Sequence, residues 1–165
     1  MASVHVLILM GSDSDAPVMQ GAVDLLQELG ISAEMTVASA HRSPERVMRL
    51  VHEAPGRGVK VFIVGAGAAA HLAGVVAAHT TMPVIGVPID SSALKGLDAL
   101  LSTVQMPPGV PVATVSIGKP GATNAGVLAA QILAVGDPAI ASRLVAYKKK
   151  LAERVEAAAE KLMNR

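Results

Sequence analysis

The sequence predicts an α/β fold of three layers (αβα), a flavodoxin- or Rossmann-like sheet of five parallel strands with a long C-terminal helix. Short runs rich in Val and Ile alternate with helical patterns along the chain, which is typical of βαβ units. The first of these runs, VHVLILM, is apolar on both alternating sides and therefore indicates a strand covered on both faces. Apolar residues keep a helical spacing over the last segment of the chain.

Each predicted element has a local reason. The predicted strands are the apolar runs 4–10, 31–37, 59–64, 83–87 and 112–117. Helical spacing of apolar residues predicts helices over 18–29, 44–54, 68–79, 96–104 and 122–133. Gly30 suits the end of the first helix, and Ser43-Pro44 suits the start of the second, since serine caps and proline fits the first helical position.

The last helix is predicted to begin after Asp137-Pro138 and to end near Met163. At a rise of ~1.5 Å per residue it would be about 39 Å long, which is comparable with the diameter of a domain of this size. We therefore expect a single α/β domain, residues 1–165, whose segment 137–165 packs on a neighbouring subunit.

Composition excludes several classes of protein. The chain has no cysteine, so disulfides, thiolate zinc sites and cysteine nucleophiles are absent. Its formal net charge is +1, with no basic run outside the last helix, so we expect no nucleic-acid partner. Glycines, histidines and prolines interrupt the long apolar region 59–89, which argues against a membrane span. With no signal-peptide layout at the N-terminus, the expected location is the cytoplasm.

The chain is unusually apolar for its length. Hydrophobic residues make up 52% and charged residues only 16%, whereas charged residues reach about 25% in typical domains. We interpret the excess as buried subunit interface, and hence expect a homo-oligomer. The alternative is a larger share of alanine-rich helix packed inside one chain.

Three unusual loops follow predicted strands: 11–17, 39–44 and 65–71. The carboxyl ends of parallel strands share one edge of a sheet, where ligands bind in such folds. The sequence therefore brings these three loops to one site.

The second loop, Ser39-Ala40-His41-Arg42-Ser43-Pro44, carries the most chemistry. It places a histidine and an arginine at a helix N-terminus, which attracts anions, and Arg42 can hold a phosphate or carboxylate through two hydrogen bonds. Positive surroundings disfavour a charged His41, so we expect it to accept a proton near pH 7. The alternative is a solvated surface turn.

The other two loops supply complementary groups. In Gly11-Ser12-Asp13-Ser14-Asp15, Ser12 suits phosphate oxygens and Asp15 suits sugar hydroxyls, although Ser14 or Asp15 can also cap a helix. The run Gly65-Ala66-Gly67-Ala68-Ala69-Ala70-His71 lets a flat group lie against backbone, and it contains no standard dinucleotide or triphosphate motif. By itself, His71 fits a structural role within a helix as well as a functional one. No pair of histidines has metal-ligand spacing.

Two other classes lack residues that they need. A response-regulator receiver shares the five-strand plan but requires an aspartate after the third strand, where this chain has Gly65-Ala66-Gly67. A flavin-binding flavodoxin requires aromatic walls, and the chain has one Phe, one Tyr and no Trp.

Together these motifs resemble one family, PurE, the N5-carboxyaminoimidazole ribonucleotide mutases of purine biosynthesis. Besides the three loops, the matching stretches are Pro83-Val84-Ile85-Gly86-Val87-Pro88, Gln105-Met106-Pro107-Pro108-Gly109-Val110-Pro111-Val112 and Asn124-Ala125. The resemblance covers about residues 4–135. One departure is Ala73, where the mutase pattern His-Leu-Pro-Gly has proline, while His71-Leu72 and Gly74 are retained.

The resemblance implies a cofactor-free, metal-free enzyme, a homo-octamer in this family. The implied substrate is a ribonucleotide, and its carboxyl group moves from N5 to ring carbon C4 by decarboxylation and recapture of CO2. By carry-over, His41 is the catalytic acid–base group. The carried-over binding residues are Ser12, Ser39 and Arg42 for the phosphate, Asp15 for the ribose, and Gly67, Ala68, His71 and Leu72 around the ring. The alternatives are a CO2-dependent aminoimidazole ribonucleotide carboxylase, the related class, and a flavodoxin-like nucleotide-binding module without catalysis.

Overall fold

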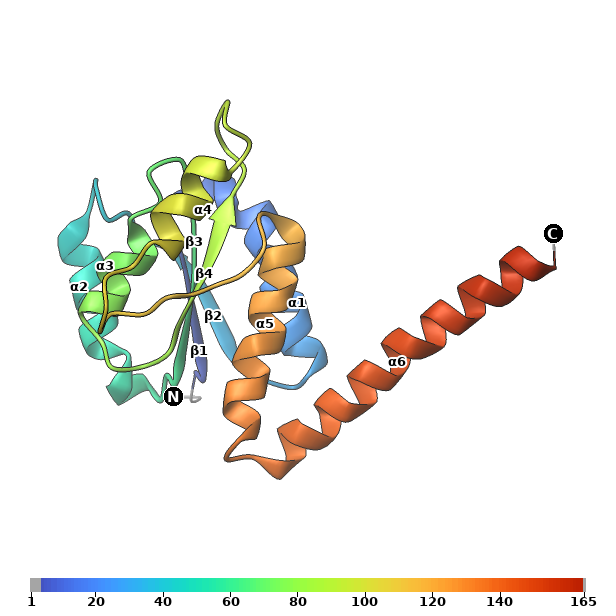
Figure 1. Ribbon diagram of the computed structural model, residues 1–165. Coiled ribbons are helices and arrows are strands. Elements are labelled where there is room, and N and C mark those ends of the chain that lie inside the picture. Colours follow the sequence, from blue (N-terminus) through green and yellow to red (C-terminus); the bar gives the residue numbers. More distant parts are fainter. Residues whose placement is uncertain (1–3, 165) are drawn as a thin grey trace.

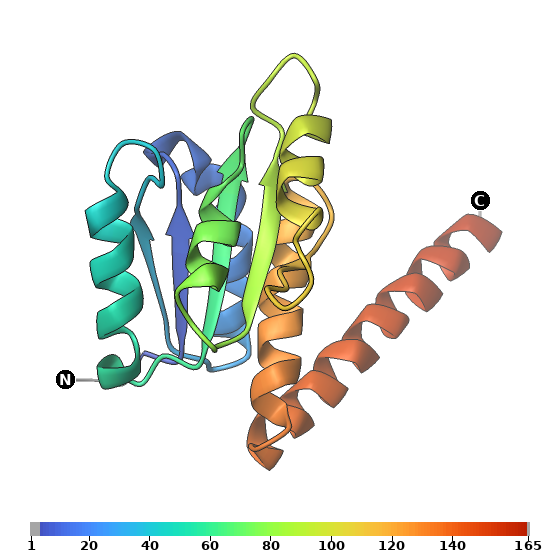
Figure 2. The same cartoon turned by 60° about the vertical axis from the view of Figure 1, so that its left-hand side comes forward.

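The computed structural model describes residues 4–164, and a sheet of five parallel strands lies at its centre (Figures 1 and 2). The strands are β1 (Val6–Met10), β2 (Ala33–Val37), β3 (Val61–Gly67), β4 (Val84–Ile89) and β5 (Ala113–Thr114). Their order is β2-β1-β3-β4-β5, the strand order of flavodoxin-like doubly wound sheets. The predicted fold class is confirmed.

Helices cover both faces of the sheet (Figures 1 and 2). They are η1 (Asp13–Asp15), α1 (Ala16–Glu28), α2 (Pro44–Glu53), η2 (Pro55–Arg57), α3 (Leu72–Ala78), α4 (Leu97–Val104), α5 (Lys119–Ala134) and α6 (Pro138–Met163). One face packs against α1 and α5, and the other against α2 and α3. A Cβ atom on Gly86 of β4 would contact both Ala73 of α3 and Thr103 of α4, so α4 lies on the same face as α3.

Burial on both faces explains why the strands are apolar throughout. In β1, Val6, Ile8 and Met10 belong to the core beneath α1 and α5, whereas Leu7 and Leu9 belong to the core beneath α2 and α3. None of the five side chains is more than 6% exposed. Alternate residues therefore serve different cores, and a polar residue at any of these positions would lose its contact with water.

The predicted helix boundaries hold best where a cap defines them. Gly30 has a φ of 64° and donates its N–H to the carbonyl of Gln27, so it ends α1 in the left-handed conformation that glycine allows. Ser43 occupies the N-cap position of α2, with Pro44 next, as predicted. However, the Ser43 hydroxyl makes no capping bond, and it donates to the carbonyl of Ser39 at 3.4 Å instead.

The third strand and the following helix were predicted with wrong boundaries. Strand β3 continues through Gly67, and α3 begins at Leu72 rather than at residue 68. Ala68 has a φ of 50°, which is outside the helical region, and the N–H groups of Ala70 and His71 bond to carbonyls only two residues back. The alanines before His71 therefore form a tight turn instead of a first helical turn.

The fifth predicted strand is also shorter than expected. Only Ala113–Thr114 pair with β4, although Val115 still donates its N–H to the carbonyl of Gly86. Helix α5 then begins at Lys119, earlier than the predicted residue 122, and carries Pro120 in its first turn. Proline is accepted there because its missing N–H would have no helical partner.

Helix α6 extends away from the rest of the chain (Figure 1). It begins where predicted, because the Asp137 carboxylate accepts hydrogen bonds from the N–H groups of Ala139 and Ile140. Ile140 is buried, but the later apolar side chains Leu151, Val155 and Leu162 are 39%, 66% and 70% exposed. An apolar stripe is thus uncovered on α6. Between residues 4 and 164, no helix has the length and apolarity that crossing a bilayer requires.

Candidate functional site

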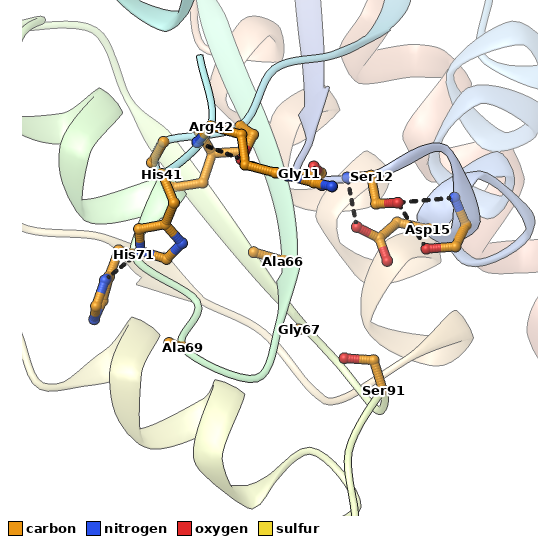
Figure 3. Close-up of a pocket in the computed structure, with 14 residues that line it drawn as sticks. Gly11, Ser12, Asp15, His41, Arg42, Ala66, Gly67, Ala69, His71 and Ser91 are labelled. Atoms are coloured by element: carbon orange, nitrogen blue, oxygen red, sulfur yellow. Dashed lines mark hydrogen bonds between the residues drawn. The ribbon is translucent and has the colours of Figure 1, made fainter. Parts of the chain in front are cut away.

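The three predicted loops meet at the carboxyl edge of the sheet and enclose a pocket of about 210 Å³ (Figure 3). The prediction that they converge is therefore confirmed. The pocket is lined by Gly11, Ser12, Ser14, Asp15, Ser39, Ala40, His41, Arg42, Ala66, Gly67, Ala69, His71, Leu72 and Ser91.

The first wall is the loop after β1, which holds itself together by a reciprocal cap. Oγ of Ser12 accepts a hydrogen bond from the N–H of Ser14, and the Asp15 carboxylate accepts one from the N–H of Ser12 at 3.1 Å. This capping box makes Ser12, rather than Ser14 or Asp15, the residue whose side chain caps η1. Both side chains line the pocket with their positions already fixed.

Asp15 is a buried carboxyl at the edge of this pocket, only 6% exposed. Burial raises the pKa of Asp15 above its ordinary value of 3.8, and the hydrogen bond from the Ser12 N–H opposes this increase. The negative charge of Asp13 adds to the increase, while the positive charge of Arg42 lowers the pKa. A ligand hydroxyl that donates to Asp15 would oppose this increase, because a hydrogen bond to a carboxylate favours its ionised form.

The second wall is the turn that contains Ser39, His41 and Arg42. Oγ of Ser39 accepts the N–H of Arg42 at 3.2 Å and lies 3.5 Å from its Nε. A terminal nitrogen of Arg42 donates to the carbonyl of Gly11 at 3.0 Å, which ties this turn to the first loop (Figure 3). Backbone N–H groups, two serine hydroxyls and a guanidinium therefore gather at one end of the pocket, which suits a phosphate.

Arg46 lies near this turn and is hydrogen-bonded to the end of β2. Its Nε donates to the carbonyl of Val37 at 2.8 Å, and its terminal nitrogen donates to the hydroxyl of Thr36 at 3.0 Å. A second, more open hollow beside the pocket is lined by both Arg42 and Arg46. The cationic end of the site thus holds two arginines, of which sequence reasoning had singled out only Arg42.

The third group is a pair of histidines. Nε2 of His41 lies 2.8 Å from Nδ1 of His71, and the two rings meet edge to face, with centroids 4.9 Å apart (Figure 3). The expectation that His71 lies within the helix that follows the third strand is wrong. Because the helix starts late, His71 is its N-cap residue and reaches the second loop.

The floor is formed by the end of β3 and the turn after it. Ala66, Gly67, Ala69 and Leu72 line the pocket with small or apolar groups, so a flat ring can lie against the backbone. Ala68, which was predicted to border the ligand, is not among the lining residues. Its left-handed conformation turns the chain between Gly67 and Ala69.

Sequence reasoning missed Ser91 as a lining residue. It follows β4, which ends at Ile89, so the rule that placed the other three loops applies to this loop as well. Among the described residues, no three His, Asp or Glu side chains are arranged to share a metal ion. The predicted absence of a metal stays a prediction.

Comparisons with known proteins agree with one another. The family model described as AIR carboxylase matches residues 5–154. The N5-carboxyaminoimidazole ribonucleotide mutase of Thermotoga maritima is 52% identical over 155 residues, which are 94% of this chain and 90% of the relative. The mutase of Mycobacterium tuberculosis is 55% identical over 150 residues, 91% of this chain and 85% of the relative.

Solved structures give the same picture. The crystal structure of Treponema denticola PurE superposes with a TM-score of 0.84 and 31% identity, covering 95% of this chain and 97% of the other. A second crystal structure from Treponema denticola, of a PurE2 variant, gives a TM-score of 0.88 at 29% identity, covering 98% and 99%. The likeness therefore extends over the long C-terminal helix as well as the sheet.

Proposed function

The chain belongs to the AIR carboxylase family, and we propose from this premise that its pocket moves a carboxyl group within a ribonucleotide, with His41 as the proton carrier. The enzyme is an N5-carboxyaminoimidazole ribonucleotide mutase of purine biosynthesis, as its curated relatives are. It transfers the carboxyl group from N5 to ring carbon C4, giving 4-carboxy-5-aminoimidazole ribonucleotide.

The observation that carries this proposal is the order of groups around one pocket (Figure 3). Ser12, Ser39 and Arg42 form a donor-rich end for the phosphate. Asp15 provides a carboxylate for ribose hydroxyls. Phosphate, sugar and base of a nucleotide follow one another in the same order, which leads from Arg42 towards the small residues of β3.

Arg42 has to be able to receive the phosphate. Its side chain is exposed, and its hydrogen bonds to Gly11 and Ser39 leave other guanidinium N–H groups for a ligand. Charge-assisted bonds of this kind are about twice as strong as neutral ones. We place the phosphate between Arg42, Ser39 and Ser12, with the neighbouring Arg46 adding positive potential.

The base is proposed to lie against Gly67 and the turn at Ala68, bordered by His71 and Leu72. Gly67 has no side chain to keep a ring away from the backbone, and the largely buried Leu72 adds an apolar group to the pocket wall. Although Ala68 does not line the pocket itself, its peptide groups connect the two lining residues, so we retain it as a backbone neighbour of the ligand.

The reaction balances without a cofactor. The bond between N5 and the carboxyl carbon breaks, CO2 is released into the pocket, and N5 takes up a proton that His41 donates. C4 then bonds to CO2, which leaves a proton on a tetrahedral C4. His41 removes that proton and restores the aromatic ring, so one proton is gained and one is lost.

The histidine pair suits this exchange. Only one proton can lie between Nε2 of His41 and Nδ1 of His71, because two facing N–H donors would repel each other. Within residues 4–164, neither Nδ1 of His41 nor Nε2 of His71 is hydrogen-bonded to protein. We propose that Nδ1 of His41 meets C4–H and that His71 holds the ring in place and shares its charge.

The alternative enzyme is a CO2-dependent aminoimidazole ribonucleotide carboxylase. The feature that favours this alternative is Ala73, which departs from the mutase pattern. Ala73 follows His71 and Leu72 in the sequence, at the position where the mutase pattern has proline. It lies in the first turn of α3 and is 2% exposed. A proline would be accepted at this position, so its absence removes rigidity without requiring a different backbone.

We further propose a homo-octamer, cytoplasmic, in which residues 1–165 form one domain and α6 packs on a neighbouring subunit. The uncovered apolar side chains of α6 support this assembly, and so do Leu97, Leu101 and Val104 on α4, which are 53%, 49% and 45% exposed. Apolar patches of this kind are uncommon on monomers.

The test is an assay of purified protein with N5-carboxyaminoimidazole ribonucleotide whose carboxyl carbon is labelled, in unlabelled bicarbonate. A mutase converts it without ATP, at a rate independent of bicarbonate, and keeps most of the label in the product. A carboxylase would require added CO2 or bicarbonate and would lose the label. A binding module would bind the nucleotide without turnover.

A further inference from the structure

Ser91 and Ser14 are polar lining groups that the proposed mechanism leaves without a role, and the Ser14 hydroxyl already donates to Ser12 at 2.9 Å. The Ser91 hydroxyl makes no hydrogen bond with any residue between 4 and 164, although it lines the pocket. By contrast, the next residue, Ser92, donates its hydroxyl to Asp98 at 2.7 Å and accepts the N–H of Leu94 at 3.1 Å. The loop is therefore fixed one residue away, while the Ser91 hydroxyl is left available.

The position of Ser91 is set by its contact with β3. A Cβ atom on Gly67 would overlap Oγ of Ser91 and lie only 2.8 Å from its Cβ. Only glycine at position 67 leaves room for the Ser91 side chain there. Since Gly67 pairs with Ile89 in the sheet, the ladder between β3 and β4 holds this contact in register.

Figure 3 shows Ser91 on the side of the pocket away from His41 and His71, with its hydroxyl pointing towards Gly67. In the proposed substrate, C5 is bonded to the ring nitrogen that carries the ribose, and C4 is one bond further away. The C5 group lies between the substituents on N1 and C4, so a base whose C4 faces His41 and whose ribose faces Asp15 directs this group between the two residues. Because the proposed phosphate occupies the Arg42 end, the C5 group faces the other side of the pocket, at Gly67. Ser91 lies on that side.

We propose that Ser91 is a substrate-contacting residue whose hydroxyl hydrogen-bonds the exocyclic N5 group of the aminoimidazole. This inference rests on the proposed function. A hydroxyl can both donate and accept. It can donate to the carboxylate carried by N5 before transfer and accept from the free amine afterwards, which an acidic or a basic side chain cannot do equally.

The experiment compares the binding of two nucleotides by calorimetry. 5-Aminoimidazole ribonucleotide carries N5, whereas imidazole ribonucleotide lacks it and is otherwise the same. Ser91→Ala should weaken binding of the first about 2- to 10-fold, the loss expected for one neutral hydrogen bond, and should change binding of the second less than about 2-fold. Ser91→Gly, which also lacks the hydroxyl, should behave alike.

Ser92→Ala is the matched control, because it removes the adjacent hydroxyl and loosens the loop without touching the pocket. It should show no preference between the two nucleotides. Equal losses for both nucleotides in Ser91→Ala, or no loss for either, would overturn the role of Ser91 while leaving the mutase intact. Failure of the wild-type protein to bind either nucleotide would instead refute the proposed function itself.

Discussion

Nε2 of His41 lies 2.8 Å from Nδ1 of His71, although 30 residues separate them in the chain. The two histidines come from the loops after β2 and after β3, two strands that lie on either side of β1 in the sheet. His71 is therefore the direct neighbour of His41, the proposed proton carrier. Substitution of either residue therefore changes the environment of the other, and the two must be compared in the same assays.

His71→Asn tests the supporting role. It removes the partner of His41 but keeps a short polar side chain at the N-cap of α3, so the helix should still begin there. We expect turnover to fall less than in His41→Asn, because His41 can still meet the substrate. Single-turnover measurements on both variants check this order, and the reverse order would exchange the two roles.

Arg42→Ala should mainly weaken nucleotide binding. Loss of a hydrogen bond to a charged group costs about 1.5–3 kcal/mol, or roughly 10- to 150-fold in affinity. The corresponding nucleoside, which lacks the phosphate, should be far less sensitive, and Ser12→Ala should show the same selectivity. Arg49→Ala, which removes an exposed arginine of α2, is the matched control for charge. Equal losses for nucleotide and nucleoside would mean that Arg42 does not hold the phosphate.

Asp15 predicts a specific dependence of stability on pH. Because burial raises its pKa, the folded protein holds this proton to a higher pH than the unfolded chain does. The folded state then binds more protons, and this carboxyl contributes a stability that is lost as pH rises from its ordinary value of 3.8 through the raised value.

Asp15→Asn removes that contribution. As the pH rises through this range, the unfolding temperature of the variant should therefore decrease less, or increase more, than that of the wild type. Asp24→Asn, which changes an exposed carboxylate of α1, is the control. Thermal unfolding at closely spaced pH values gives the comparison. If Asp15→Asn follows the wild-type profile, burial does not perturb this carboxyl in solution.

Helix α6 should hold the assembly together. Sedimentation should show a species several times heavier than the 16.7 kDa chain, and deletion of residues 138–165 should weaken it. Leu151→Asp should do the same, since it places a charge in the apolar stripe. Lys149→Asp, about 200° away around the helix, should leave assembly intact. An unchanged mass distribution after the deletion would show that α6 is not an intersubunit element.

Sequence patterns predicted most of the fold because each had a local cause. The β1 run is apolar since both of its faces are buried, and Gly30 and Asp137 mark helix ends through their own backbone and side-chain bonds. Convergence of the loops followed from the parallel sheet alone.

The remaining features depend on conformations that residue types do not specify. Ala68 adopts a positive φ, which alanine seldom does, and this delays α3 and brings His71 to His41. A run of alanines before a helical pattern does not indicate such a turn. The rule that ligands bind beyond the carboxyl ends of parallel strands could have indicated Ser91. Its contact with Gly67, however, depends on the path of the loop after β4.

The central claim, proton transfer by His41 in a mutase, is tested most directly by the turnover of His41→Asn with N5-carboxyaminoimidazole ribonucleotide. Asparagine keeps similar size and hydrogen bonding but cannot carry a proton. The variant should bind the nucleotide within a few-fold of the wild type and lose at least about 10²-fold in turnover, the lower end for a positioned acid–base group. Near-normal turnover in His41→Asn, with collapse in His71→Asn, would contradict the account and assign the proton to His71.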